Sequence, residues 1–414
     1  MIRIVAGQTA AATVKRLALR TNDLSKLEPR VRRIVKDVRR KGDTSLRRYA
    51  ERWDRLAPGH SLQVSGAEIE AAAESVPGET RTALRHAADN IRQFCQWQKP
   101  KSWTRTSKGC SLGQLVHPLD SVGCYVPGGR YPLVSTLLMT AIPAQVAGVP
   151  NIRIVSPNPS QEMLAAAAML GLTEIFRVGG AQAIAALAYG TKTIARVDKI
   201  VGPGNAYVTV AKKLVSFDCA IDLIAGPTEA VVLSESGMPA YIAADLVSQA
   251  EHDPDSLAVF ITTSRALAKS VAAAMALTAK QNPIARTSLR ARGAILIADS
   301  RDQARAWANE IAPEHITIDP DDLPFIRNAG SIFVGDYSPQ SAGDYASGPN
   351  HVLPTSGQAR FRGGLSVLDF VKLITVQQHS ADSLRRISKT VERLAQMEGL
   401  QAHAESVRVR IAHA

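Results

Sequence analysis

The sequence predicts an α/β fold built from two parallel sheets that are covered by helices. From about residue 118 onward, short apolar strands alternate with helices, which is the pattern of right-handed βαβ crossovers. Glycine-rich turns follow several of these strands. Because two such series follow one another along the chain, we expect two sheet domains with a cleft between them.

Amphipathic runs near 25–52, 66–75 and 80–98 predict that the chain begins with helices. The expected division is an N-terminal mainly helical segment at 1–117, a first α/β domain at 118–227, a second α/β domain at 228–360 and a helical C-terminal tail at 361–414.

Each α/β series predicts its own set of elements. In the first we expect strands at 121–126, 152–156, 174–178 and 198–201, with helices at 161–170 and 181–189 and a helix ending at 215. In the second we expect strands at 228–233, 257–263, 294–298, 315–318 and 331–334, with helices at 239–251, 265–279 and 301–311.

Glycine turns mark the expected ligand-binding edges, because ligands of parallel sheets bind beyond the carboxyl ends of the strands. At those ends we expect Gly128-Gly129, Gly179-Gly180, Gly202–Gly204 and Gly226-Pro227.

Composition excludes several classes of protein. The 414 residues are 45% hydrophobic and 21% charged, as in ordinary globular proteins. The net charge is +12, but the basic run 30–41 is an amphipathic helix and aromatic residues make up only 5%, so nucleic-acid binding is not expected. Four cysteines without a C-x-x-C pair, no secretory signal and no run of 18 apolar residues predict a cytoplasmic protein that does not enter a membrane.

Gln249 and His252 lie three residues apart in a helix-compatible run that should end before Pro254. On one helical face, an amide oxygen and an imidazole would suit a zinc ion. By spacing alone, a polar helix end with a solvated histidine is the commoner reading.

Glu314 and His315 stand together where a helix passes into a strand. Imidazole and carboxylate are suited to proton transfer near neutral pH, although a surface pair would have the same spacing. Asp344 lies in the polar, glycine-rich stretch 341–351. Either this stretch is a ligand-binding loop in which Asp344 is an anionic oxygen donor, or it is a long surface turn.

The turn Gly202-Pro203-Gly204-Asn205 lacks the third glycine of the standard dinucleotide fingerprint. It is either structural or a non-standard nucleotide loop, with Asn205 and Gln182 as polar contacts. Glu398 and His403 could serve one site only if the helix breaks at Gly399 between them. A cysteine nucleophile is not expected, since none of the cysteines has a neighbouring base.

In combination and order, these segments resemble the histidinol dehydrogenase family from about residue 20 to 413. The matching motifs are Tyr125-Val-Pro-Gly-Gly129, Val178-Gly-Gly-Ala-Gln182, Gly202-Pro-Gly-Asn205, Ser248-Gln-Ala-Glu-His252, Ser341-Ala-Gly-Asp-Tyr-Ala-Ser347 and His351-Val-Leu-Pro-Thr355. The resemblance implies two incomplete Rossmann-like domains with small terminal ones, and oxidation of L-histidinol to L-histidine with two NAD and one bound Zn²⁺ per subunit. It also implies a homodimer in which the tail completes the partner's site.

The resemblance also implies a role for each candidate residue. The zinc ligands would be Gln249, His252, Asp344 and His403, the acid/base pair Glu314 and His315, and the NAD contacts Tyr125, Gln182 and Asn205. Substrate contacts would be Thr228, Gln249, His252, His315, Asp344, Glu398 and His403. Thr228 departs from the serine that the family often has there, keeping the hydroxyl but adding a methyl group.

Two alternatives stay open. The first is a paralogous zinc- and NAD-dependent dehydrogenase of another polar alcohol, and the second is a zinc hydrolase in which metal-bound water attacks.

Overall fold

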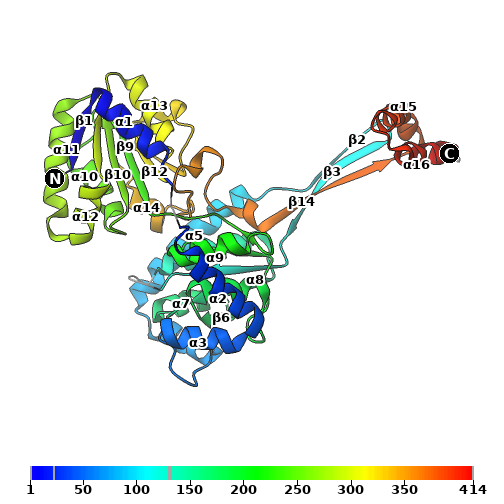
Figure 1. Ribbon diagram of the computed structural model, residues 1–414, viewed down its shortest axis with the longest axis horizontal. Coiled ribbons are helices and arrows are strands. Elements are labelled where there is room, and N and C mark those ends of the chain that lie inside the picture. The colour runs from blue at the N-terminus through cyan, green and yellow to red at the C-terminus, as the bar shows by residue number, and fades with distance from the viewer. Residues whose placement is uncertain (1, 22–23, 129–132, 413–414) are drawn as a thin grey trace.

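The computed structural model describes residues 2–21, 24–128 and 133–412, so Gly128 of the predicted Gly128-Gly129 turn is described and Gly129 is not. Two parallel sheets form the body of the molecule, and a three-stranded antiparallel sheet forms an arm (Figure 1). The predicted α/β class is therefore confirmed.

The first sheet has five parallel strands in the order β6-β5-β4-β7-β8. Its strands are β4 (Ser121–Tyr125), β5 (Asn151–Ser156), β6 (Ile175–Arg177), β7 (Lys199–Val201) and β8 (Ala220–Ile221). If β4 is counted as the first strand, the order across the sheet is 3-2-1-4-5. The strand order therefore reverses between β4 and β7, and folds of this kind bind nucleotides at such a point. Four of the strands were predicted, and the two-residue β8 was not.

Helices cover both faces of the first sheet. On one face lie α4 (Gly66–Ser75), α5 (Gly78–Gln98), α6 (Val134–Ala147) and α7 (Gln161–Met169). On the other lie α2 (Glu28–Lys41), α3 (Asp43–Trp53), α8 (Gly180–Tyr189) and α9 (Ala206–Val215). The apolar stripe of α2 is buried at Val31, Ile34, Val35 and Val38, which confirms the amphipathic interpretation of the basic run.

The second sheet has six parallel strands in the order β1-β11-β10-β9-β12-β13. Its strands are β1 (Arg3–Ala6), β9 (Glu229–Leu233), β10 (Leu257–Thr262), β11 (Ala294–Ile297), β12 (His315–Ile318) and β13 (Ser331–Val334). Counted from β9, it repeats the order of the first sheet, with β1 added beside β11. The sequence did not predict β1, which joins the start of the chain to the second sheet.

The second sheet is also covered on both faces. α1 (Gly7–Ala18) and α13 (Arg301–Ile311) pack on one face, and α10 (Pro239–Ala250), α11 (Arg265–Thr278) and α12 (Pro283–Ala291) on the other. Shorter elements are α14 (Gln340–Tyr345), η1 (Ala279–Gln281), η2 (Pro320–Phe325), η3 (Gln358–Arg360) and η4 (Val367–Phe370).

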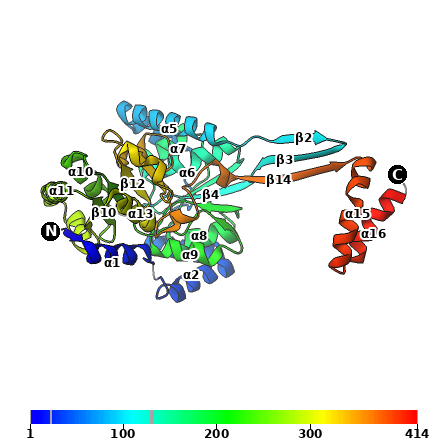
Figure 2. The ribbon, with the colours of Figure 1, turned by 90° about the horizontal axis from the view of Figure 1, so that it is seen from above.

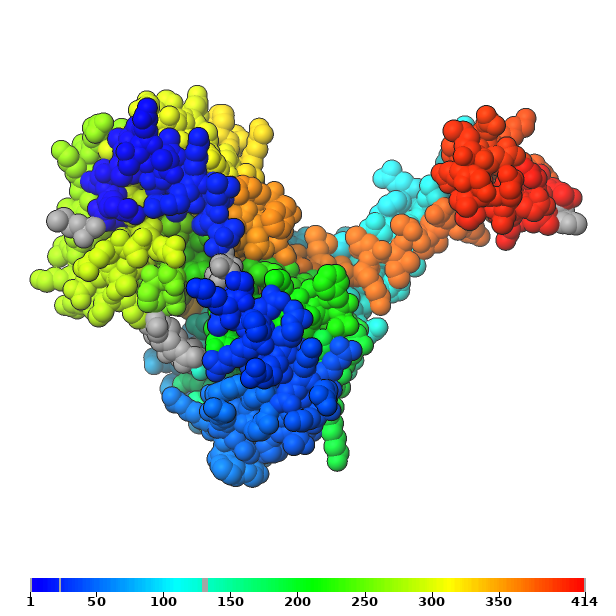
Figure 3. Space-filling view, viewed as in Figure 1, coloured from blue at the N-terminus to red at the C-terminus, as the bar shows by residue number. Residues whose placement is uncertain are grey.

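The arm consists of β2 (Trp103–Ser107), β3 (Cys110–Pro118) and β14 (Val371–His379), followed by α15 (Ala381–Met397) and α16 (Gln401–Ala412). It carries the two C-terminal helices away from the body (Figure 2). The space-filling view shows the same projection (Figure 3).

A purely helical tail at 361–414 was wrong, because β14 is a nine-residue strand paired with β3. Nearly all of β14 is exposed, so it lacks the apolar alternation that marks a half-buried strand. The domain boundaries otherwise stay predictions. Among the described helices, none is both long and apolar enough to cross a membrane.

Candidate functional site

A cavity of about 180 Å³, which we call the His315 cavity, brings most of the predicted site residues together. It is lined by Thr228, Gln249, His252, Glu314, His315 and Asp344 from the second domain. Its other wall includes Pro203 and Leu223, which follow β7 and β8 of the first sheet. A cavity of about 570 Å³ adjoins it and shares His252 and Tyr345.

The His315 cavity lies at the amino ends of β9 and β12, since Thr228 directly precedes β9 and His315 begins β12. This corrects the expectation for Gly226-Pro227, which stand just before β9 and not at its carboxyl end. The carboxyl edge of the first sheet thus meets the amino edge of the second.

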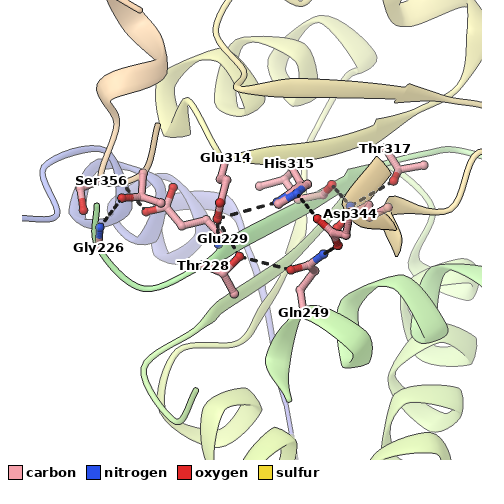
Figure 4. A network of polar contacts seen from close by, with 12 residues as sticks. Gly226, Thr228, Glu229, Gln249, Glu314, His315, Thr317, Asp344 and Ser356 are labelled. Carbon is pink, nitrogen blue, oxygen red and sulfur yellow. Dashed lines mark hydrogen bonds and ion pairs between the residues drawn. The ribbon is translucent and has the colours of Figure 1, made fainter. Parts of the chain in front are cut away.

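Glu314 is buried and tightly held. Its Oε2 accepts hydrogen bonds from Thr228 Oγ1 at 2.6 Å and from the backbone N–H of Glu229 at 2.9 Å (Figure 4). Burial raises the pKa of Glu314 to about 7, against the opposing effect of these donors and of His315. A carboxyl group with such a pKa can exchange a proton near neutral pH.

His315 lies between two carboxylates. Its Nε2 is 3.2 Å from Asp344 Oδ1, and its Nδ1 is 3.8 Å from Glu314 Oε2 (Figure 4). Burial lowers the pKa of His315, but the charge of Glu314 and the contacts with Asp344 outweigh it, so the net shift is upward. Nδ1 is buried and has no hydrogen-bond partner among the described residues. In the tautomer whose Nε2–H donates a hydrogen bond to Asp344, the lone pair is on Nδ1.

Asp344 connects the acid/base pair to the predicted metal ligands. Its Oδ2 accepts a hydrogen bond of 2.9 Å from Gln249 Nε2, and its Oδ1 faces His315. Burial raises the pKa of Asp344, yet His315 and Gln249 together bring it below its usual value. The predicted polar loop at 341–351 is wrong at its start, where α14 carries Asp344 as a helical residue.

Gln249 and His252 both line the cavity, but they do not share a helix. α10 ends at Ala250, so His252 lies two residues past its end and is exposed, whereas Gln249 is buried. The helix-face prediction is therefore wrong for His252. The chain leaves the helix before Pro254, whose ring restricts the residue before it.

His351 is a half-buried residue of this cavity to which sequence reasoning gave no catalytic or ligand role. Its Nδ1 lies 2.8 Å from the carbonyl oxygen of Asp344, and its Nε2 lies 3.3 Å from Thr136 Oγ1. Burial lowers the pKa of His351, so the neutral ring fixes the backbone of the residue that binds His315. Its signals in the sequence were its place in the predicted polar loop and at the start of the motif His351-Val-Leu-Pro-Thr355.

Glu398 and His403 are not brought to this cavity within the chain. Both are exposed at the far end of the arm, on either side of Gly399, which has a φ of +75° (Figure 1). α15 ends at Met397 and α16 begins at Gln401, which confirms the predicted helix break at Gly399.

The three predicted NAD contacts line a second cavity, of about 440 Å³, which we call the Asp54 cavity. Tyr125 ends β4, Gln182 lies in the first turn of α8, and Asn205 caps α9 by accepting from the N–H groups of Tyr207 and Val208. Tyr125 thus lies at a carboxyl end of the first sheet, and Gln182 and Asn205 lie beyond such ends, where nucleotides bind in folds of this kind.

A buried ion pair fixes the backbone of the turn 202–205, which lies between the two cavities. Lys212 and Asp222 form the ion pair. Asp222 accepts a hydrogen bond of 2.7 Å from the backbone N–H of Gly202, and Lys212 donates one of 3.1 Å to the carbonyl oxygen of Gly202. This fixed turn places Pro203 in the His315 cavity and Asn205 in the Asp54 cavity.

Asp54 is a residue that sequence reasoning missed. It follows α3, is buried, and its Oδ2 accepts from the Gly179 N–H at 3.0 Å and from Gln182 Nε2 at 2.9 Å. Burial raises the pKa of Asp54 to about 6.

The donor chemistry of the His315 cavity fits a divalent metal ion. An amide, an imidazole and a carboxylate line it in Gln249, His252 and Asp344, and such nitrogen and oxygen donors suit zinc or manganese. No group of three His, Cys, Asp or Glu side chains poised to hold a metal occurs within residues 2–21, 24–128 and 133–412.

Comparison with known proteins gives one consistent family. The model of the family described as histidinol dehydrogenase matches residues 17–411. Histidinol dehydrogenase of Geobacter sulfurreducens is 48% identical, with 91% of this chain and 92% of that protein covered. Histidinol dehydrogenase 2 of a Nostoc species is 43% identical, with 99% of each chain covered. The crystal structure of histidinol dehydrogenase from Elizabethkingia anophelis has a TM-score of 0.93 at 35% identity, covering 100% of this chain and 98% of that one.

Proposed function

Since this chain belongs to the histidinol dehydrogenase family of oxidoreductases, we propose that it oxidises L-histidinol through histidinaldehyde to L-histidine, using two NAD and one bound Zn²⁺ per subunit. The reaction would serve histidine biosynthesis in the cytoplasm. The observation that carries the proposal is the His315 cavity, in which an acid/base pair and three metal-ligand candidates meet.

In the first half-reaction, His315 takes the proton of the substrate hydroxyl while a hydride leaves the same carbon for NAD. The position of His315 supports this role, because its side chain lines the cavity and Asp344 faces its Nε2 and orients the ring. The raised pKa of His315 makes it a stronger base than a free imidazole.

In the second half-reaction, Glu314 takes a proton from the water that adds to the aldehyde. The hydrated aldehyde then gives a second hydride to NAD and becomes the carboxylic acid. Thr228 Oγ1 and the N–H of Glu229 orient the Glu314 carboxylate for this step. A pKa near neutrality lets the group accept and release a proton in each turnover.

Gln249, His252 and Asp344 would hold the zinc ion, with His403 as the further donor. A zinc ion held there would fix the imidazole and amine of the substrate, and since zinc does not change oxidation state, both electron pairs would pass to NAD. Tyr125, Gln182 and Asn205 would contact NAD, and the Asp54 cavity that they line supports this assignment.

A homodimer would supply the missing donor. Glu398 and His403 are exposed on the arm, away from the body of their own chain, which supports their use in the partner's site (Figure 1). In a two-fold dimer this exchange is reciprocal. Glu398 and Thr228 would then contact the substrate from different subunits.

The proposal is tested by following absorbance at 340 nm with NAD and L-histidinol as the only substrates. NADH formation with L-histidinol, and much slower formation with amino alcohols that lack the imidazole, is the expected result. Equal rates with another polar alcohol would favour a paralogous dehydrogenase instead.

A further inference from the structure

The Asp54 cavity contains a carboxylate that the reaction as derived above does not use. We infer that Asp54 binds the adenosine ribose diol of the dinucleotide and thereby selects NAD over its 2′-phosphorylated form, an inference that rests on the proposed NAD-dependent function.

Asp54 has one oxygen engaged and one free for a ligand. Oδ2 accepts both protein hydrogen bonds, from Gly179 and Gln182, and no described residue donates to Oδ1. The residue is only 8% exposed, yet it lines the cavity, so its exposed part faces that space. A buried carboxylate oxygen without a donor gains free energy when a ligand hydroxyl supplies one.

In dinucleotide-binding folds, an Asp or Glu at a fixed position binds the ribose hydroxyls, and this chain has no Asp or Glu at that position. That acid follows the second strand of the sheet, which here is β5. β5 ends at Ser156, and the next residues are Pro157-Asn158-Pro159-Ser160. Asp54 is the one carboxylate among the described residues that line the cavity, and it reaches the sheet from the end of α3.

The two cavities determine which end of the dinucleotide meets Asp54. Hydride transfer takes place in the His315 cavity, so the nicotinamide must lie toward Pro203, which lines that cavity. The adenosine then extends past Asn205 into the Asp54 cavity. There, Trp53 and Tyr207 line the same cavity as Asp54 and offer aromatic surfaces to a purine base.

Charge explains the selectivity. Burial raises the pKa of Asp54 to about 6, so the group is ionised at pH 7.5 and accepts from both hydroxyls of a diol. A 2′-phosphate removes one hydroxyl and brings negative charge against the carboxylate. Arg30 lines the same cavity, but its guanidinium carbon lies 5.4 Å from the Tyr207 ring centroid, and no ion pair joins it to Asp54 among the described residues.

The test measures binding of NAD and NADP to the full-length protein by calorimetry at pH 7.5, which does not depend on turnover. The wild type should bind NAD at least about tenfold more tightly than NADP. In Asp54→Asn this preference should shrink by about ten- to hundredfold, mainly through weaker NAD binding. Asp89→Asn, a change of the same charge on the exposed surface of α5, should leave the preference unchanged.

Three results would overturn the inference. Equal affinity of the wild type for the two cofactors would do so without any variant. Unaltered affinities for both cofactors in a folded Asp54→Asn protein would do so as well. If the variant bound NAD and NADP more weakly by the same factor, Asp54 would only position Gln182 and would not select the cofactor. If NAD binds selectively but L-histidinol is not oxidised, the proposed function fails while the role of Asp54 stands.

Discussion

Nε2 of His315 lies 3.2 Å from Oδ1 of Asp344, so the imidazole that we propose as the base is oriented by a residue that also belongs to the proposed zinc site. Oδ2 of the same carboxylate accepts from Gln249 Nε2 at 2.9 Å. The proposed acid/base pair and the proposed metal site therefore share one side chain.

Zinc removal should abolish turnover without unfolding the protein. Gln249 lies in α10, His252 in the turn after it and Asp344 in α14, and the domain that contains them has its own buried apolar core, so we expect the fold not to need the ion. We expect chelation to stop NADH formation, and Zn, Mn or Co to restore it. Gln249→Ala, His252→Ala and Asp344→Ala should each lower bound zinc by metal analysis, whereas His60→Ala, at an exposed histidine, should not. A metal-stripped protein with near-normal rates would disprove the ligand assignment.

Glu314→Gln should separate the two half-reactions. Only aldehyde oxidation needs added water, so its rate should fall by about 10²–10⁴-fold, with a smaller loss in alcohol oxidation. The two steps are assayed separately with histidinol and histidinaldehyde.

Glu310→Gln provides a matched control for this change, since Glu310 is exposed on α13, four residues before Glu314. It should leave both rates unchanged. Equal losses of both half-reactions in Glu314→Gln would count against a separate role for Glu314.

Asp54 should make the protein less stable as the pH rises. Burial raises its pKa from 3.8 to about 6, so the folded protein holds this proton more tightly than the unfolded chain does. The contribution to the free energy of unfolding therefore decreases between about pH 4 and pH 6, by roughly 3 kcal/mol in all.

Asp54→Asn should remove this dependence. In urea unfolding, the variant should be more stable than the wild type at pH 8 and close to it at pH 4.5, where Asp54 is largely protonated in the folded protein. Asp89→Asn should show no such difference. The same stability gap between Asp54→Asn and wild type at both pH values would show that burial does not shift this group.

Co-expression of two variants that are each inactive, His252→Ala and His403→Ala, should give active protein. If each site uses its own His252 and the partner's His403, a mixed dimer of His252→Ala and His403→Ala has one intact site. Random assembly makes half of the dimers mixed, so about a quarter of all sites should work. Activity that stays at background in verified mixed dimers would place His403 in its own chain's site.

The sequence predicted the two α/β series well, because buried parallel strands are short, apolar and flanked by turns. The strands 315–318 and 331–334 match β12 and β13 residue for residue. The arm was missed for the opposite reason, since β14 is exposed and acquires its structure only by pairing with β3.

For the candidate site, the single motifs predicted which side chains could be donors, but they did not predict which of these side chains are in contact. Gln249 and Asp344 meet across 95 residues of chain, and no local periodicity predicts that contact. Asp54 is still less visible from sequence, because it lies in a helical segment 125 residues before Gly179, to which it binds. His252 was placed on the wrong element because helix-compatible residues continue past the point where α10 ends.

The most direct test of the proposed function is the stoichiometry of a complete turnover. A limiting amount of L-histidinol is incubated with excess NAD, and NADH and L-histidine are quantified at completion. Oxidation of an alcohol to an acid removes four electrons, so we expect two NADH for each L-histidinol, with L-histidine as the product. One NADH per substrate with accumulated aldehyde, or no NADH at all, would contradict the account.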